Sequence, residues 1–348
     1  MSSISLGPDD RPQFTRFVEN QFKTKLVPPP KNLTFNGQTA VITGSNVGIG
    51  LECARVMVEH HISFLILAVR SKEKGETAAR QMRQKHAGVK IEVWPLDMLD
   101  YDSCCAFAKR CDELPRLDIA ILNAGLAKMA WNINDSTGHE EVFQVNYLST
   151  ALLSLLLLPV LKKTASVRGQ PSRLTIVSSF LGCVAAFKNR DSVPLLPSFD
   201  QLDGKFGIAE HQERYSVSKT LSLMLTFKLG EVVDPSEVIV NAVEPGYTKG
   251  TGLQREVKGV VFHVILWLLG LAARSPRQAA WTYIDAVGVQ GKGSHGSFLM
   301  NFRNMSYPSM MYKQEGRQVV ERLWEETLDE LDFANVKAVV GGSDKDKS

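Results

Sequence analysis

Six short apolar runs, separated by helix-like segments, follow one another between Thr39 and Pro245. The runs read TAVIT, ISFLILAV, VKIEVWPLD, LDIAILNAG, SRLTIVSS and EVIVNAVEP, and begin at residues 39, 62, 89, 117, 172 and 237. Strands that are buried on both faces lack the polar alternation of half-exposed strands, so such runs are typical of a parallel sheet with helices on both sides. The pattern predicts a doubly wound α/β fold in a single domain.

The overall composition excludes several classes of protein. The chain has 348 residues, of which 44% are hydrophobic and 22% charged, as in an ordinary globular protein. Its 40 Lys and Arg against 37 Asp and Glu leave a net charge of +3, which gives no electrostatic footprint for nucleic acid. The five cysteines are odd in number and form no C-x-x-C pair, which favours reduced thiols over disulfides or zinc. The histidines also lack partners at ligand spacing, so we expect no metal site.

The chain divides into an extension, a domain and a tail. We expect an N-terminal extension over residues 1–36, a domain over 37–332 and a largely disordered tail over 333–348. Residues 180–214 and 247–274 carry little strand pattern and are expected to leave the sheet as insertions. Within the extension, one short apolar helix face is expected from Phe14, Phe17, Val18 and Phe22.

Two apolar stretches raise the question of a membrane. Ala151–Leu161 is about half a span, and Gly259–Ala273 is still shorter than the ~20 residues that cross a bilayer. We expect buried or groove-lining helices and no transmembrane span, with peripheral membrane contact as the alternative. The N-terminus is polar and acidic rather than signal-like, which favours a cytoplasmic location.

A glycine-rich turn joins the first apolar run to a helix-like segment. Glycines at this place permit a tight turn and let backbone N–H groups and a helix N-terminus approach a pyrophosphate. The spacing is G-x-x-x-G-x-G, and the strand–turn–helix context predicts a Rossmann-type dinucleotide site. Its expected contacts are Gly44, Ser45, Asn46, Val47, Gly48, Ile49 and Gly50.

The ends of the next strands indicate which dinucleotide binds. Arg70 and Lys72 follow the second strand, where an NAD enzyme usually has an acid, and two cations there favour the 2′-phosphate of NADP(H). The alternative is a pair of ordinary solvated cations. Further cofactor contacts are expected at the ends of the third and fourth strands, from Asp97, Asn123, Ala124 and Gly125.

Tyr215 and Lys219 are four residues apart and therefore share a helix face. A lysine ammonium ~4 Å from the phenol would lower the pKa of the tyrosine by up to about three units and make it a usable acid or base. The pair follows a strand that ends in Ser178-Ser179 and precedes one that ends in Pro245-Gly246.

In this order, TGSNVGIG, Asp97, NAG, Asn146, Ser179, the Tyr215/Lys219 pair and Pro245-Gly246 resemble the classical short-chain dehydrogenase/reductase superfamily. The segments LILAVRSKEKGE, LDIAILNAGLA, the GHE before FQVN, and GSHGSFL resemble its retinol-dehydrogenase-like branch in filamentous fungi. Many members of this branch are encoded among genes for secondary metabolites.

The resemblance implies a role for each matching residue. Tyr215 would protonate a carbonyl oxygen, Ser179 would polarise it, and Asn146 would hold a water that links Lys219 to solvent. Lys219 would bind the nicotinamide ribose beside Tyr215. Pro245, Gly246 and Thr248 would contact the nicotinamide, with Thr251 an alternative to Thr248 because the family threonine is displaced here. The two insertions would form a substrate wall and, over Val257–Leu271, a lid.

These observations lead to an NADPH-dependent oxidoreductase that interconverts a carbonyl and an alcohol on a lipophilic small molecule, as a ketoreductase of secondary-metabolite biosynthesis. The alternatives are a membrane-associated retinoid- or steroid-like dehydrogenase, a non-catalytic NADP-binding regulator, and an imine or enone reductase. The resemblance implies a homodimer or tetramer through the helices that contain 151–161 and 215–229. Packing of these helices inside one chain is equally consistent with their apolar stripes.

Overall fold

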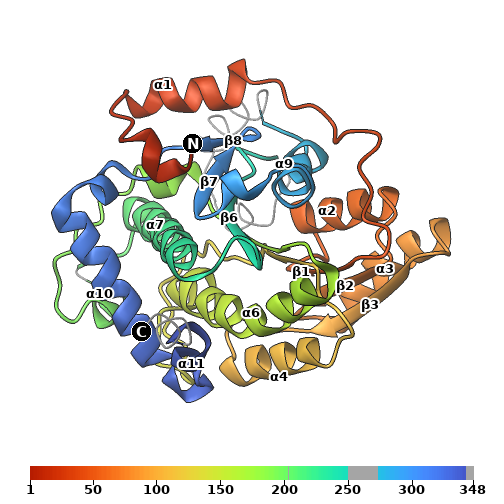
Figure 1. The fold of residues 1–348 in the computed structure, drawn as a ribbon. Coiled ribbons are helices and arrows are strands. Elements are labelled where there is room, and N and C mark those ends of the chain that lie inside the picture. The colour runs from red at the N-terminus through yellow and green to blue at the C-terminus, as the bar shows by residue number, and fades with distance from the viewer. Residues whose placement is uncertain (203, 250–272, 342–348) are drawn as a thin grey trace, which may run out of the picture.

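One twisted sheet forms the centre of the protein. The computed structural model describes residues 1–202, 204–249 and 273–341 (Figure 1). In this part of the chain the sheet has eight strands in the order β3-β2-β1-β4-β5-β6-β7-β8, and only β8 runs antiparallel to its neighbour. The strands are β1 Thr39–Thr43, β2 Phe64–Val69, β3 Lys90–Pro95, β4 Ile119–Leu122, β5 Ser172–Val177, β6 Val238–Glu244, β7 Ser297–Met300 and β8 Arg303–Met305.

The predicted doubly wound fold is confirmed, since helices pack on both faces of this sheet. One face carries α2 Gly48–Glu59, α3 Lys72–Lys85 and α9 Pro276–Gly288, whose apolar residues share one hydrophobic core. The opposite face carries α4 Tyr101–Asp112, α6 Ser149–Arg168 and α7 Ile208–Val232, which share the second core. The six predicted strands are all present. The short strands β7 and β8 were not predicted.

Helix α6 is the core helix of its face. Together with the segment before it, Glu141–Arg168, it is long and apolar enough to cross a membrane, but 89% of its most apolar window is buried inside the domain. The C-terminal helices α10 Gln314–Glu330 and α11 Val336–Val340 pack against α7 and α6, respectively (Figure 1). In both helices that were predicted as an interface, the stretches 151–161 and 216–229 are largely buried within the domain.

The ends of the chain differ from the sequence-based expectation. Residues 333–341, predicted to belong to a largely disordered tail, include α11, and Val336 is buried against the α6 face. At the other end, the expected apolar helix face is wrong. Phe14 is 77% exposed and Phe22 54% exposed, whereas Arg16, Asn20 and Gln21 are buried. The surface beneath this helix presents Glu244 and the backbone of Tyr247, which amide side chains can bond and phenyl rings cannot.

Short helical pieces complete the fold. Within the expected insertion 180–214, α7 already begins at Ile208, and Glu326 of α10 accepts hydrogen bonds from the N–H groups of Leu195 and Leu196. The apolar stretch 257–271, which we expected to form a lid, lies outside the described residues. The remaining pieces are η1 Ser3–Leu6, α1 Gln13–Val18, η2 Glu19–Lys23, α5 Glu141–Phe143, η3 Gln144–Leu148, η4 Phe180–Cys183, η5 Leu196–Asp200, η7 Lys292–Ser294, η8 Ser309–Tyr312 and η9 Asp332–Ala334.

Candidate active site

The glycine-rich turn lies between β1 and the N-terminus of α2. Gly44 and Gly48 have φ values of +65° and +61°, which L-residues with side chains rarely adopt. Ser45 is buried and its hydroxyl donates to the carbonyl of Ile42, so this serine shapes the turn from inside. The turn leaves Asn46, Val47 and Ile49 partly or fully accessible at the start of the helix. The geometry fits an anion bound by backbone N–H groups.

The NAG turn after β4 is tied directly to the glycine-rich turn. Asn123 donates through Nδ2 to the carbonyls of Thr43 and Gly44, at 2.8 and 3.2 Å. A Cβ at Gly50 would lie 2.6 Å from this Nδ2, so only glycine fits there. The Asn123 Oδ1 accepts a hydrogen bond from Tyr283 of α9, a residue that sequence reasoning missed. Asn123 therefore holds the two turns together as one rigid edge.

Arg70 and Lys72 stand at the end of β2, beside this edge. Both side chains are exposed, and within the described ranges neither forms an ion pair with an acid. The carbonyl of Ala68, two residues before Arg70, accepts the Gly44 N–H at 2.8 Å, which places the cations next to the glycine-rich turn. This arrangement leaves both cations available to a phosphate group.

Asp97 follows β3 at the same edge and is half-buried. One of its oxygens accepts the N–H of Leu99, whereas Asp100 caps α4. Asp97 is therefore not the N-cap of α4 and keeps its place at the cofactor edge.

Asn146 lies in η3, a single turn of π-helix between α5 and α6, and is 2% exposed. Single π-turns inside helices are frequent at functional sites. Its side chain accepts the N–H of Leu126 at 2.7 Å and donates to the Leu126 carbonyl and to Ser218 Oγ, both at 2.9 Å. A Cβ at Gly125 would lie 3.2 Å from Asn146 Oδ1 and 3.7 Å from Lys219 Nζ. Asn146, Lys219 and the NAG turn thus converge on one place.

The two serines after β5 have different environments. Ser178 is 2% exposed, and its hydroxyl hydrogen-bonds to the Lys219 carbonyl and to Ser222. Ser179 is half-buried, and its Oγ accepts the Leu181 N–H at 3.2 Å. The accessible serine is the one that the sequence pattern selects.

Tyr215 and Lys219 lie on one face of α7, as predicted. The Lys219 Nζ is 5.8 Å from the centroid of the Tyr215 ring and donates to the Val177 carbonyl at 2.9 Å. Burial lowers the pKa of Lys219 to about 8. Burial, aided by the negative charge of Glu244, raises the pKa of Tyr215.

The expected depression of the Tyr215 pKa is therefore wrong for this state of the protein. Desolvation of the buried phenol penalises the tyrosinate, and the negative charge of Glu244 adds to this penalty.

The loop after β6 brings Pro245 and Gly246 to the same side of the sheet. Gly246 has a φ of +81°, and a Cβ there would lie 2.2 Å from Arg274 Nη1. Thr248 is 5% exposed and its hydroxyl donates to the Gly246 carbonyl, so it fastens the loop. The alternative threonine, Thr251, lies outside the described residues.

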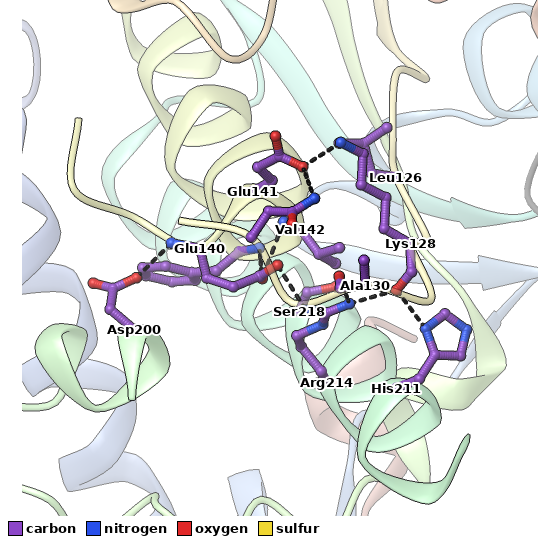
Figure 2. Close-up of polar contacts among 12 residues, drawn as sticks. Leu126, Lys128, Ala130, Glu140, Glu141, Val142, Asp200, His211, Arg214 and Ser218 are labelled. Carbon is purple, nitrogen blue, oxygen red and sulfur yellow. Dashed lines mark hydrogen bonds and ion pairs between the residues drawn. The ribbon is translucent and has the colours of Figure 1, made fainter. Parts of the chain in front are cut away.

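A buried ion pair beside Tyr215 was not predicted from the sequence. Arg214 Nη1 lies 2.7 Å from Glu140 Oε1, and Glu140 is fully buried (Figure 2). The other Glu140 oxygen accepts the N–H groups of Val142 and Phe143 at the start of α5. Arg214 also donates to the Lys128 carbonyl, at 2.5 Å. Through Glu140 the ion pair holds the start of α5, which leads into Asn146. Through Arg214, the residue before Tyr215, it holds the segment after the NAG turn.

The fold and this arrangement define the class of the protein. A solved NADPH-bound carbonyl reductase from chicken fatty liver superposes with a TM-score of 0.57 at 20% identity, over 78% of this chain and all of that one. A family model for short chain dehydrogenases matches residues 38–189.

Two fungal relatives extend the match to nearly the whole chain. The short chain dehydrogenase/reductase mfmJ of Annulohypoxylon moriforme is 45% identical over 98% of both chains. The short chain dehydrogenase virL of Hypocrea virens is 42% identical over 93% of each. The chain belongs to the short-chain dehydrogenase/reductase family and is an oxidoreductase of fungal type. Among the residues that the structure describes, no group of three or more histidines, cysteines or acids is placed to hold a metal ion.

Proposed function

We propose that this protein is an NADPH-dependent reductase that converts a carbonyl into an alcohol, or catalyses the reverse reaction. The convergence of Asn146, Lys219 and Gly125 at the carboxyl edge of the sheet carries the proposal. Ser179 and Tyr215 are both half-buried beside this edge rather than sealed in the core. These are the residue types that hold and protonate a carbonyl oxygen.

The edge fits a dinucleotide phosphate. The positive φ values of Gly44 and Gly48 open the backbone at the start of α2 to a pyrophosphate, and Arg70 and Lys72 stand where a 2′-phosphate would lie. NADPH-bound carbonyl reductase from chicken fatty liver shares the fold, which supports the same cofactor here. When bound, the reduced nicotinamide supplies a hydride.

The chain's own residues then supply the proton and the orientation. Ser179 donates a hydrogen bond to the carbonyl oxygen and stabilises the charge that develops on it. The Tyr215 hydroxyl transfers its proton to that oxygen as the C–H bond forms, which leaves a tyrosinate. Lys219 stabilises the tyrosinate. A water held by Asn146 would link Lys219 to solvent, so that a proton can return to Tyr215. A raised pKa makes Tyr215 a weaker acid, so the proposed proton transfer depends on the Lys219 ammonium to stabilise the tyrosinate as it forms.

The substrate that we propose is a lipophilic small molecule of fungal secondary metabolism. Sequence identities of 45% and 42% to fungal short-chain dehydrogenases over nearly full length support this class of role. A non-catalytic regulator would not need the complete set of proposed catalytic residues. Their presence therefore favours a catalyst, and the set comprises Asn146, Ser179, Tyr215 and Lys219.

The first experiment is a paired titration of NADPH and NADH, followed by nicotinamide fluorescence. We expect NADPH to bind more tightly, because only its 2′-phosphate meets Arg70 and Lys72. Equal binding of both would refute the phosphate argument, and binding of neither by folded protein would refute the proposed function.

The second experiment is Tyr215→Phe, assayed with NADPH against a panel of apolar ketones. Loss of the general acid should lower turnover by about 10²–10⁴-fold, while NADPH binding stays unchanged. Tyr101→Phe, at the start of α4, is the matched control and should retain activity. Turnover by Tyr215→Phe at the wild-type rate would assign the proton transfer elsewhere.

A further inference from the structure

The N-terminal segment lies against the proposed site with a polar face. Over α1 and η2, residues 13–23 run along one side of the domain (Figure 1). Asn20 is 4% exposed and Gln21 7% exposed, which is unusual for amides on a short surface helix. Buried amides are retained where they satisfy other polar groups, so their partners indicate what the segment does.

The side-chain amide of Gln21 hydrogen-bonds to both backbone groups of Tyr247, as a neighbouring strand's backbone would. Its Nε2 donates to the Tyr247 carbonyl at 2.9 Å, and its Oε1 accepts the Tyr247 N–H at 3.0 Å. Tyr247 directly follows Pro245-Gly246, the loop that we assign to the nicotinamide. One side chain from residue 21 thus satisfies both backbone groups of a residue 226 positions away.

Asn20 holds the other side of the same loop through Arg274. The Asn20 carbonyl accepts Arg274 Nη2 at 2.8 Å, and Arg274 Nη1 donates to the Pro245 carbonyl at 2.9 Å. The Asn20 Nδ2 donates to Glu244, the last residue of β6, at 3.3 Å. Arg274 also pairs its backbone N–H with the Tyr247 carbonyl, at 2.9 Å. Each residue from Glu244 to Tyr247 therefore lies against Asn20, Gln21 or Arg274.

The segment also reaches the serine side of the site and is anchored at its start. The Arg16 guanidinium lies 5.1 Å from the ring centroid of Phe180, the residue after Ser179, and pairs with Asp9 at 3.2 Å. Further back, the Ser3 hydroxyl accepts the N–H of Phe298 in β7 at 2.8 Å. A segment fixed at Ser3 and at Gln21 can hold a loop in place, whereas a loosely attached one could not.

We propose that residues 1–23 are a positioning element of the active site, in which Gln21 and Asn20 hold the Pro245–Tyr247 loop in the conformation that receives the nicotinamide half of the cofactor. This inference rests on the proposed function, since it assumes a dinucleotide at the sheet edge. It predicts that the N-terminal segment affects the nicotinamide half of NADPH and leaves the adenosine half untouched.

The test compares two ligands in two variants. Gln21→Met keeps the volume of the side chain and removes both hydrogen bonds to Tyr247. Gln13→Met makes the same change at an exposed glutamine of the same helical segment. Binding of NADPH and of 2′,5′-ADP, which carries the 2′-phosphate without a nicotinamide, is measured by calorimetry on the full chain.

We expect Gln21→Met to weaken NADPH binding about tenfold, because two net hydrogen bonds that order the loop are lost. Binding of 2′,5′-ADP should stay unchanged, and Gln13→Met should change neither. Gln21→Asn keeps the amide on a side chain one methylene shorter, which cannot make both hydrogen bonds to Tyr247, so its effect should be intermediate. This variant also serves if Gln21→Met does not fold.

Three results would overturn the inference alone, and a fourth would overturn the proposed function with it. Unchanged NADPH binding in Gln21→Met would show that the loop does not need the segment. Equal weakening of NADPH and 2′,5′-ADP would show a general structural role. If wild-type protein binds 2′,5′-ADP and NADPH with the same affinity, the loop does not contact the nicotinamide. If the folded wild type binds neither ligand, the proposed function itself fails, and the inference falls with it.

Discussion

Two buried carboxylates flank the helix of Tyr215, and the fold satisfies them differently. Glu140 meets Arg214 directly at 2.7 Å and also caps the start of α5 (Figure 2). Glu244 is linked to Arg274 through Asn20, which donates to the carboxylate with its side chain and accepts from the guanidinium with its carbonyl. Burial raises the pKa of both carboxyl groups, and the guanidinium opposes that shift in each case.

The difference lies in what each cluster fixes. The Glu140 cluster joins elements that already pack in the domain core, so its contribution is mainly to stability. The Glu244 cluster joins a loop of the proposed site to the N-terminal segment, and the Glu244 charge helps to raise the pKa of Tyr215. We therefore expect changes at Glu140 to affect folding and changes at Glu244 to affect the site.

The largest effect is expected from Glu140→Ala. The change leaves the Arg214 guanidinium buried without its partner and removes the cap from Val142 and Phe143, at a cost of about 3–5 kcal/mol in the free energy of unfolding. Urea denaturation measures this difference. The matched control is Glu141→Ala, whose ion pair with Lys128 is less buried and should matter by no more than about 1 kcal/mol. Similar losses of unfolding free energy in both variants would show that the buried ion pair of Glu140 contributes no more than the less buried one of Glu141.

The next effect is a pH dependence on the Glu140 side. Burial disfavours a charged His139, but its hydrogen bonds with Asp200 at 2.8 Å and Glu330 at 3.0 Å outweigh this and raise the pKa of His139 to about 9. The raised pKa stabilises the fold fully below the unfolded value of about 6.5, and this stability is lost as the pH rises through the folded value. The loss is on the order of 3 kcal/mol.

The stability that His139 contributes is measured by denaturant unfolding of the wild type and of His139→Gln between pH 6 and 10. The wild type should lose stability over this range relative to the variant. Parallel curves would show that His139 does not carry the charge.

The smallest effect on stability is expected from Glu244→Gln. Arg274 keeps the carbonyls of Pro245 and Asn20, and Asn20 can still donate to the new amide oxygen, so the cost should be about 1 kcal/mol. Because the Glu244 charge raises the pKa of Tyr215, its removal should shift the basic limb of the pH–rate profile to lower pH. A loss of stability as large as that of Glu140→Ala, with an unmoved profile, would abolish the contrast between the clusters.

The sheet and its cofactor edge were predictable because their signals are local. The strands from β1 to β6 lie in short, mostly apolar runs, and the turns that follow them carry their glycines and polar residues in sequence. The strand β8 has three residues, too few for a pattern, and the four residues of β7 lack the longer apolar run LDIAIL that contains β4. Tyr283 and Arg274 were missed because their partners, Asn123 and Pro245, are far away in the sequence.

The sequence by itself determined the doubly wound sheet, the glycine-rich turn and the shared helix face of Tyr215 and Lys219, since periodicity and backbone freedom act over a few residues. Only the tertiary structure decided that Phe14 faces outward while Asn20 and Gln21 are buried, and that burial rather than Lys219 controls the pKa of Tyr215. Burial and hydrogen-bond partners depend on which distant segments pack together. A residue's own neighbours in the chain do not contain that information.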